Sequence, residues 1–374
     1  MAHSNKLLNR SKEKESKKTK RETNARVMVQ YVVEWLPRIQ SISVVVEGWK
    51  QVEIKNLKDT LMSISGDEEQ VEDILLPVEV EEKVDTSYKF KNRGKDLEWM
   101  TKLRSKSSKI YDSSIMSLPD GRWTKEELRS DSDFSIECLN CKQKIISKDN
   151  CQVLNDMPSE FWFELMDYWH CHKPDVKEDK SSYTRFETLK PSKNEILIGS
   201  SYFQGTPATF ENVATTKEND NVLCIKCSAV LGQVTAGSLY KLHKWKLQLI
   251  RSGNTYKFPP ECDITISLIN VVKANSCRYV LVKCKTESLL VWIFSVDIGV
   301  TLTGNKSFKR AMKLLYTNSV TTINRCLNRQ VVEELDFQET SFNAFYSSLQ
   351  HTNALLPSSM KKIGEWTISY TSLI

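Results

Sequence analysis

The sequence predicts an α+β protein, and three observations lead to that prediction. Apolar residues alternate after Met28, two matching cysteine motifs lie in the middle of the chain, and strand-like segments precede amphipathic ones near the C-terminus. We therefore expect a β-rich N-terminal unit, a zinc-stapled central module with a large insertion, and a C-terminal sheet with two or three helices. The expected boundaries are 1–27 for a disordered basic tail, 28–132 for the N-terminal unit and its connection, 133–245 for the zinc-binding module and 246–374 for the C-terminal α+β region.

Composition places the chain among intracellular globular proteins. Its 374 residues are 40% hydrophobic, which is enough to fill real cores. The mean hydropathy is −0.41, and no uncharged apolar run reaches the roughly 18 residues that a membrane span needs. The first 30 residues lack the apolar core of a signal peptide. Ten unevenly spaced cysteines without such a signal indicate a reducing compartment, where they serve as ligands or buried thiols.

The net charge of +6 lies entirely in the tail. Of 53 basic and 47 acidic residues, nine and three lie in residues 1–27, which leaves 44 of each in the rest of the chain. A neutral body does not attract phosphate, so direct nucleic-acid binding is not expected. The tail is a solvated extension, a nuclear address or an arm that touches RNA, and we favour the solvated extension. Translation from Met28 would remove it.

Period-two alternation predicts the N-terminal strands. Tyr31, Val33 and Trp35 alternate with other residues until Pro37, and Ile42 begins a second alternating run.

The C-terminal region contains both kinds of pattern. Strands are expected at Ile264, Ile266 and Leu268, at 279–282 and at 289–294. Two amphipathic helices are expected from apolar residues spaced i, i+3, i+4, i+7. The first stripe is Phe308, Ala311, Met312 and Leu315, and the second is Phe342, Phe345, Tyr346 and Leu349.

The cysteine motifs are two versions of one pattern. Cys138-Leu-Asn-Cys141 and Cys224-Ile-Lys-Cys227 each follow a strand-like segment, and an apolar residue lies four positions after the second cysteine. A two-residue gap lets a tight turn direct both sulfurs at one point, so the two turns together suit tetrahedral Zn²⁺. Four thiolates leave no open coordination position, which predicts a structural metal. The alternatives are unrelated pairs of buried thiols or a redox pair.

The insertion between the motifs contains a second cluster of polar and aromatic side chains. Pro158 opens an expected helix whose acidic edge is Glu160, Glu164 and Asp167 and whose aromatic face includes Trp162 and Trp169. The turn His170-Cys171-His172 follows. It is a mixed metal site, an activated nucleophile, or a structural or partner-facing turn, and we favour the last reading because no second ligand pair lies at suitable spacing. The aromatics suit either a core or a binding surface.

Known enzyme signatures do not occur in the sequence. It has no Gly-rich phosphate loop, HExxH, GxSxG or kinase motif, and its 12 glycines do not favour a nucleotide-binding enzyme.

In their order along the chain, the motifs resemble the HECT-like family that binds ubiquitin-conjugating enzymes, a eukaryotic family of proposed ubiquitin ligases. The resemblance extends from Met28 over most of the chain. The segments that carry it are Cys138-x-x-Cys141, Met157-Pro158-Ser159-Glu160-x-Trp162-x-Glu164-Leu165, Trp169-x-Cys171-His172, Ile198-Gly199-x-x-Tyr202-Phe203 and Cys224-x-x-Cys227-x-x-x-Leu231-Gly232.

The resemblance implies two partners and one candidate nucleophile. The partners are a ubiquitin-conjugating enzyme, with the Cys138 box implicated, and the metallo-β-lactamase-fold endonuclease of pre-mRNA 3′-end processing. The resemblance also implies a location in cytoplasm and nucleus. Cys326-Leu-Asn-Arg329 resembles the stretch around the HECT thioester cysteine. A HECT domain of full size does not fit beside the zinc module, so we favour a bystander thiol at Cys326.

Two functional hypotheses follow. In the first, the chain is a ubiquitin-ligase-family protein that binds a ubiquitin-conjugating enzyme and the 3′-end endonuclease. In the second, it is a non-catalytic chaperone or inhibitor of that endonuclease, with no ubiquitin transfer of its own.

Overall fold

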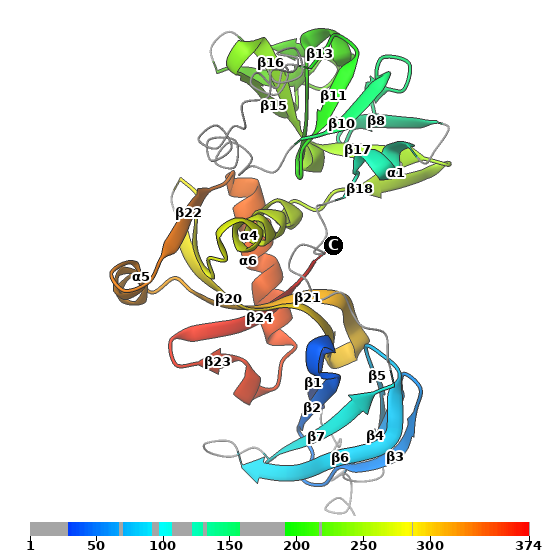
Figure 1. Cartoon of the computed structure of the whole chain (residues 1–374), viewed down its shortest axis with the longest axis vertical. Helices are drawn as coiled ribbons and strands as arrows, with labels where there is room; N and C mark the ends of the chain where they lie inside the picture. Colours follow the sequence, from blue (N-terminus) through cyan, green and yellow to red (C-terminus); the bar gives the residue numbers. More distant parts are fainter. Residues whose placement is uncertain are drawn as a thin grey trace, which may run out of the picture.

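A ten-stranded sheet forms the centre of the molecule and contains both the first and the last described strand (Figure 1). The computed structural model describes residues 29–66, 70–91, 97–106, 122–129, 133–157, 191–216, 219–285 and 287–373. In spatial order the main path of the sheet is β23 (Lys362–Ile363), β24 (Trp366–Ser372), β21 (Lys306–Thr317), β20 (Ser288–Leu302), β1 (Gln30–Leu36), β2 (Ser41–Glu47), β7 (Leu97–Ser105) and β6 (Val80–Lys91). β19 (Tyr279–Lys283) pairs with β20, and β22 (Val332–Asp336) runs parallel to β19.

The N-terminal strands form as expected, but they do not stand apart from the C-terminal region. Tyr31, Val33 and Val44 are buried in one apolar cluster, and the intervening Val32 and Val45 are buried in another on the opposite face. β1 pairs with β2 on one side and with β20 on the other, where Val32 lies opposite Leu302. The two parts therefore share one sheet, and the boundaries at 132 and 246 remain predictions.

A three-stranded sheet covers the N-terminal strands. It consists of β3 (Glu53–Lys58), β4 (Leu61–Ser65) and β5 (Val71–Leu75). Met62 and Ile64 of β4 pack with Tyr31 and Val33 of β1 in one apolar cluster. Burial of these side chains holds the small sheet against the large one.

The strand predicted at Ile264, Ile266 and Leu268 is wrong, because these residues lie in helix α4 (Glu261–Asn275). Nearly every residue from 263 to 272 is buried, so the helix shows no polar face that would reveal its period. Short apolar runs of this kind do not distinguish a buried helix from a strand. The start signals were present, namely Pro260 at the N-cap and acidic residues in the first turn.

The helix predicted at Phe308, Ala311, Met312 and Leu315 is also wrong, because these residues lie in β21. The strand is buried on both faces: Ala311 and Leu315 pack in one cluster and Met312 in another. Irregular pairing with β20 shifts the register three times. Burial on two faces, combined with these bulges, imitates a helical stripe.

Helices cover one face of the sheet over β19 to β21. The predicted helix at residues 342–349 is confirmed as α6 (Glu339–Ala354), and α4 packs beside it. Phe342, Phe345 and Leu349 of α6 are buried with the strands in one core. The short helix α5 (Val320–Leu327) packs on the opposite face of the sheet, against Leu281 and Leu290. The described part of the C-terminal region thus has a sheet and three helices, in line with the predicted count.

The central module, residues 133–257, contains two further sheets, and we call it the zinc module. The seven-stranded sheet follows the order β10 (Val153–Asp156), β11 (Glu195–Ile198), β12 (Tyr202–Gly205), β16 (Leu239–His243), β15 (Val230–Thr235), β14 (Asn221–Cys224) and β13 (Val213–Thr215). The four-stranded sheet follows the order β18 (Asn254–Lys257), β17 (Leu247–Arg251), β8 (Phe134–Cys138) and β9 (Lys144–Ser147). Helix α1 (Lys125–Arg129) precedes it. β17, which follows residue 245, pairs with β8, and the boundary expected at 245 remains a prediction.

No described helix is long and apolar enough to cross a membrane. Short 3-10 turns join several strands. These turns are η1 (Pro37–Ile39), η4 (Pro207–Thr209), η5 (Ala236–Ser238), η6 (Lys244–Lys246), η7 (Thr303–Asn305) and η8 (Ser358–Met360). Taken together, the described chain is a β-rich α+β protein with several sheets and few helices.

Candidate metal centre

Each cysteine pair occupies a turn between two neighbouring strands. Cys138 ends β8 and Cys224 ends β14. The next strands, β9 and β15, both begin six residues later, at Lys144 and Val230. The two motifs are therefore equivalent hairpin turns, which we call the knuckles (138–143 and 224–229).

The knuckles share the same hydrogen bonds. In each, the N–H of the first cysteine donates to the carbonyl five residues later, on Gln143 at 2.8 Å and on Ala229 at 3.0 Å. The carbonyl of the first cysteine accepts from the residue after the second cysteine, Lys142 at 2.9 Å and Ser228 at 2.8 Å. Lys142 and Ser228 both have left-handed backbones, with φ of 60° and 56°. The internal repeat of the sequence is thus a repeat of backbone geometry.

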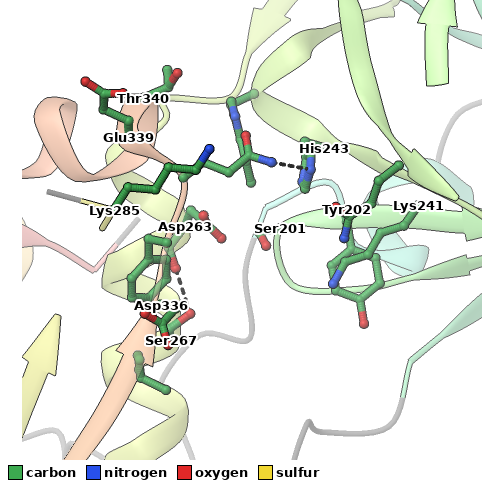
Figure 2. Close-up of a pocket in the computed structure, with 15 residues that line it drawn as sticks. Ser201, Tyr202, Lys241, His243, Asp263, Ser267, Lys285, Asp336, Glu339 and Thr340 are labelled. Carbon is green, nitrogen blue, oxygen red and sulfur yellow. Dashed lines mark hydrogen bonds between the residues drawn. The ribbon is translucent and has the colours of Figure 1, made fainter. Parts of the chain in front are cut away.

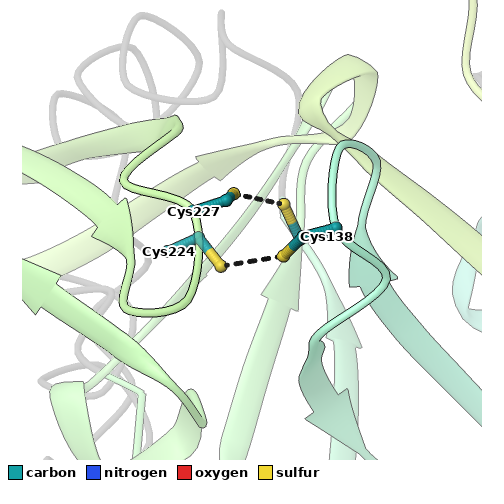
Figure 3. Close-up of side chains that lie close together, drawn as sticks. Cys138, Cys224 and Cys227 are labelled. Atoms are coloured by element: carbon teal, nitrogen blue, oxygen red, sulfur yellow. Dashed lines mark hydrogen bonds between the residues drawn. The ribbon is translucent and has the colours of Figure 1, made fainter.

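The structure brings the four predicted ligands to one point (Figure 3). All four sulfurs lie within 4.8 Å of one another. The Sγ atoms of Cys138 and Cys227 are 3.7 Å apart, and those of Cys141 and Cys224 are 3.5 Å apart. Sulfurs about 2.3 Å from a tetrahedral Zn²⁺ are separated by about 3.8 Å, so the arrangement fits that ion and leaves no open position.

The thiols differ in acidity because their surroundings differ. Burial raises the pKa of Cys138 to about 12. The backbone N–H of Ala229 lowers the pKa of Cys227 to about 6. A metal binds thiolates, so ion binding at neutral pH would release protons from the buried members of the set.

A short strap, Glu211–Asn212, lies outside the cysteine motifs and joins β9, directly after the first knuckle, to the second knuckle. The Asn212 side chain donates to the Lys144 carbonyl at 2.9 Å, and the Asn212 carbonyl accepts from the Ile225 N–H at 3.0 Å. The N–H of Glu211 donates to the Ile145 carbonyl at 2.8 Å. Sequence analysis missed these residues because nothing in their local pattern marks them as contacts of the site.

The tips of the knuckles are apolar and exposed. Leu139 and Ile225 occupy the same position in their motifs and are 37% and 62% exposed. Lys142 and Lys226, also exposed, flank them, and neither knuckle contains an acidic residue. The Leu139 N–H donates to the carbonyl of Lys246 at 3.1 Å, so this tip is fixed by the backbone.

Cys326 lies away from the knuckles, in α5 beside the large sheet (Figure 1). Its side chain is half-buried against Leu281, Leu290 and Ile323. Within the described residues its thiol has no hydrogen-bond or ion-pair partner. The candidate role of Cys326 as a nucleophile therefore remains a prediction.

The predicted partner-binding residues of the insertion lie outside the described residues, so their roles remain predictions. They are Glu160, Trp162, Glu164, Asp167, Trp169, His170, Cys171 and His172.

A buried lysine is a feature that sequence analysis did not identify. Lys244 is 1% exposed, and burial lowers its pKa to about 7. Its ammonium donates to four backbone carbonyls at 2.7–3.5 Å, those of Arg122, Trp123, Gly199 and Ser200. These carbonyls compensate the burial of the charge and fasten the chain before α1 to the zinc module. A single lysine in a basic run carries no sequence signal for this role.

Fold and site together define a β-rich α+β protein with a pair of cysteine knuckles suited to a structural metal. Comparison with known proteins then assigns the family. Residues 34–368 match the family described as HECT-like ubiquitin-conjugating enzyme (E2)-binding, and the chain belongs to it. This confirms the resemblance carried by the motifs and supports a ubiquitin-ligase-related, E2-binding function.

Individual relatives agree with the family. A protein of Saccharomyces cerevisiae is 99% identical over 347 residues, which is 93% of this chain and 100% of the relative. An E3 ubiquitin-protein ligase of Homo sapiens is 21% identical over 287 residues, covering 63% of this chain and 72% of the relative. One of Rattus norvegicus is 24% identical over 144 residues, covering 38% and 36%. No solved structure matches significantly.

Proposed function

We propose that this chain is a ubiquitin-ligase-family scaffold that holds a structural zinc ion and binds a ubiquitin-conjugating enzyme through the tips of its two knuckles. The observation that carries this proposal is that Leu139 and Ile225 occupy equivalent positions in the two knuckles and are both exposed beside one four-cysteine site. Exposed apolar residues on a fixed backbone are suited to a protein interface, because little conformational entropy is lost on binding. Lys142 and Lys226 would favour an acidic rim on the partner.

In this proposal the chain does not form a ubiquitin thioester. Four thiolates saturate the metal, and Cys326 is half-buried with no activating partner among the described residues. Transfer of ubiquitin would therefore come from the bound conjugating enzyme.

Binding to the conjugating enzyme is tested by titrating purified enzymes of this class against wild type and the double variant Leu139→Ser/Ile225→Ser. We expect at least tenfold weaker binding in the variant, with unchanged zinc content and melting temperature. Val71→Ser is the matched control, because Val71 is 52% exposed on β5, outside the zinc module. Equal affinity in the folded, zinc-loaded double variant would reject the knuckle tips as the contact.

We further propose that the chain acts in pre-mRNA 3′-end processing, in cytoplasm and nucleus, by binding the metallo-β-lactamase-fold endonuclease. The motif resemblance supports this, as does the predicted acidic edge of Glu160, Glu164 and Asp167, which suits a basic, RNA-cutting partner. Charge reversal of these three residues should weaken endonuclease pull-down, most at low salt, and leave the melting temperature nearly unchanged. If pull-down is undiminished, these three residues form only a solvated helix face and do not contact the endonuclease. Fluorescent tagging tests the location.

A further inference from the structure

A cleft of about 730 Å³ separates the seven-stranded sheet of the zinc module from the helices of the large sheet (Figure 2). The register places Tyr202 opposite His243 and Gln233 opposite Lys241. These four side chains line the cleft, while the intervening Leu242 is buried in the core of the module. One face of the sheet therefore packs inward, and its other face forms a wall of the cleft.

The opposite wall comes from the first turns of α4 and α6 and from the end of β22. It carries Asp263, Glu339 and Asp336, whereas the zinc-module wall carries Lys241 (Figure 2). Lys285 is the exception, since it projects a positive charge from the helix side. The helix side of the cleft thus carries three acidic groups, and each side carries one lysine, Lys241 or Lys285.

His243 is uncharged, so it adds a polar group but no charge to the basic wall. Burial, together with Lys241 and Lys246, lowers the pKa of His243 to about 4. The nitrogen Nε2 of His243 lies 2.9 Å from Nε2 of Gln338 at the start of α6. An amide nitrogen only donates, so the imidazole accepts this bond in its neutral form.

Ser201 points to a ligand for the cleft. It is 8% exposed, and its hydroxyl is directed into the cleft (Figure 2). Within the described residues this hydroxyl has no hydrogen-bond partner, and neither does the ammonium of Lys285. Both groups face the cleft, so each can donate a hydrogen bond to an acceptor that binds there.

We infer that this cleft binds a short peptide segment carrying both an acidic group and a basic side chain. The acidic group would accept from Ser201 and Lys285 and lie near Lys241, and the basic side chain would reach Asp263 or Glu339. A simple anion is disfavoured by the three carboxylates of the helix wall, and a simple cation by the two lysines. The volume lies within the range of protein ligand sites. This site is separate from the knuckle tips and goes beyond the proposed enzyme contact.

A random hexapeptide display library, panned against the zinc-loaded full chain, tests the inference without knowledge of the natural ligand. We expect enriched peptides that contain at least one acidic and one basic residue. The affinity of a selected peptide should fall at least tenfold in Lys241→Glu and in Glu339→Lys, and less in Ser201→Ala.

Lys309→Glu is the matched control, because Lys309 is exposed on β21 and does not line the cleft. Its peptide affinity should stay within twofold of wild type. Zinc content and melting temperature verify that each variant is folded. The inference is overturned if no peptide is enriched, if enriched peptides carry charges of one sign only, or if both charge reversals leave the affinity unchanged. None of these outcomes depends on the conjugating enzyme.

Discussion

The zinc module and the ten-stranded sheet are stabilised by different interactions. The sheet buries one face under α4 and α6 and has an apolar core that needs no ion. The zinc module has its own apolar core, but its two sheets also meet at the cysteines, where β8 and β14 end. The difference means that one half of the molecule should depend on metal and on reducing conditions while the other half should not.

The largest difference between the two halves should appear when one cysteine ligand of the metal centre is removed. Cys138→Ser leaves an incomplete cage, and structural zinc supplies about 10 kcal/mol or more of folding free energy in small domains. We expect loss of the single bound zinc and rapid proteolysis within residues 133–257, while fragments of the large sheet persist. Cys284→Ser, outside the cage, should keep the zinc. Wild type that is folded and soluble but contains no zinc would contradict the metal centre.

A core substitution in α6 should produce the opposite pattern. Phe345 is 1% exposed between the helix and the sheet, so Phe345→Ala should lower the free energy of unfolding by about 3–5 kcal/mol. Zinc content should remain at one ion per chain. The exposed neighbour Asn343, changed to Ala, serves as control. Loss of zinc together with the helix would show that the two halves unfold as one unit.

Acidification should act on the boundary between the halves through His243. Its pKa is about 4 in the folded chain and near 6.5 when unfolded, so the unfolded state binds the proton first. The stabilising effect of the neutral imidazole is complete above pH 6.5 and falls as the pH drops towards 4, by up to about 3 kcal/mol.

Urea unfolding of wild type and His243→Gln at pH 7.5, 6 and 5 measures this effect. Acid should also release a metal held by the four cysteines, equally in both proteins, so the difference between them isolates the histidine. A difference that does not change with pH would contradict the assignment.

The smallest effect should come from Cys326. If the chain is a scaffold, Cys326→Ala changes ubiquitin transfer by the bound enzyme less than twofold. A reducible ubiquitin adduct that forms on wild type and disappears in this variant would instead identify Cys326 as an acceptor.

What the sequence could predict depends on whether a feature leaves a local pattern of residues. The knuckles were found because four ligands in two short repeats leave a local pattern, as at Cys138 and Cys141. The strap at Asn212 and the bond between His243 and Gln338 were missed, because contacts between distant segments leave no such pattern.

At two places the type of secondary structure predicted from the sequence is wrong, and the physical reason is the same. α4 and the second half of β21, from Ala311 on, are largely buried on all sides, and there apolar periodicity no longer separates a helix from a strand. Where one face is polar, as in α6, the period identified the element.

The pairing of β1 with β20 has a consequence for synthesis on the ribosome. Tyr31 bonds to Thr303, which lies 272 residues further along the chain. At roughly 5–20 residues per second, β1 leaves the ribosome about 15–50 s before its partner strand exists. During that time the edge of β1 that later pairs with β20 stays open, and this edge, rich in valine, is ready to pair with any other nascent strand. A stalled or truncated message would therefore release a chain that aggregates through β1, and cotranslational chaperones should be needed most at this edge.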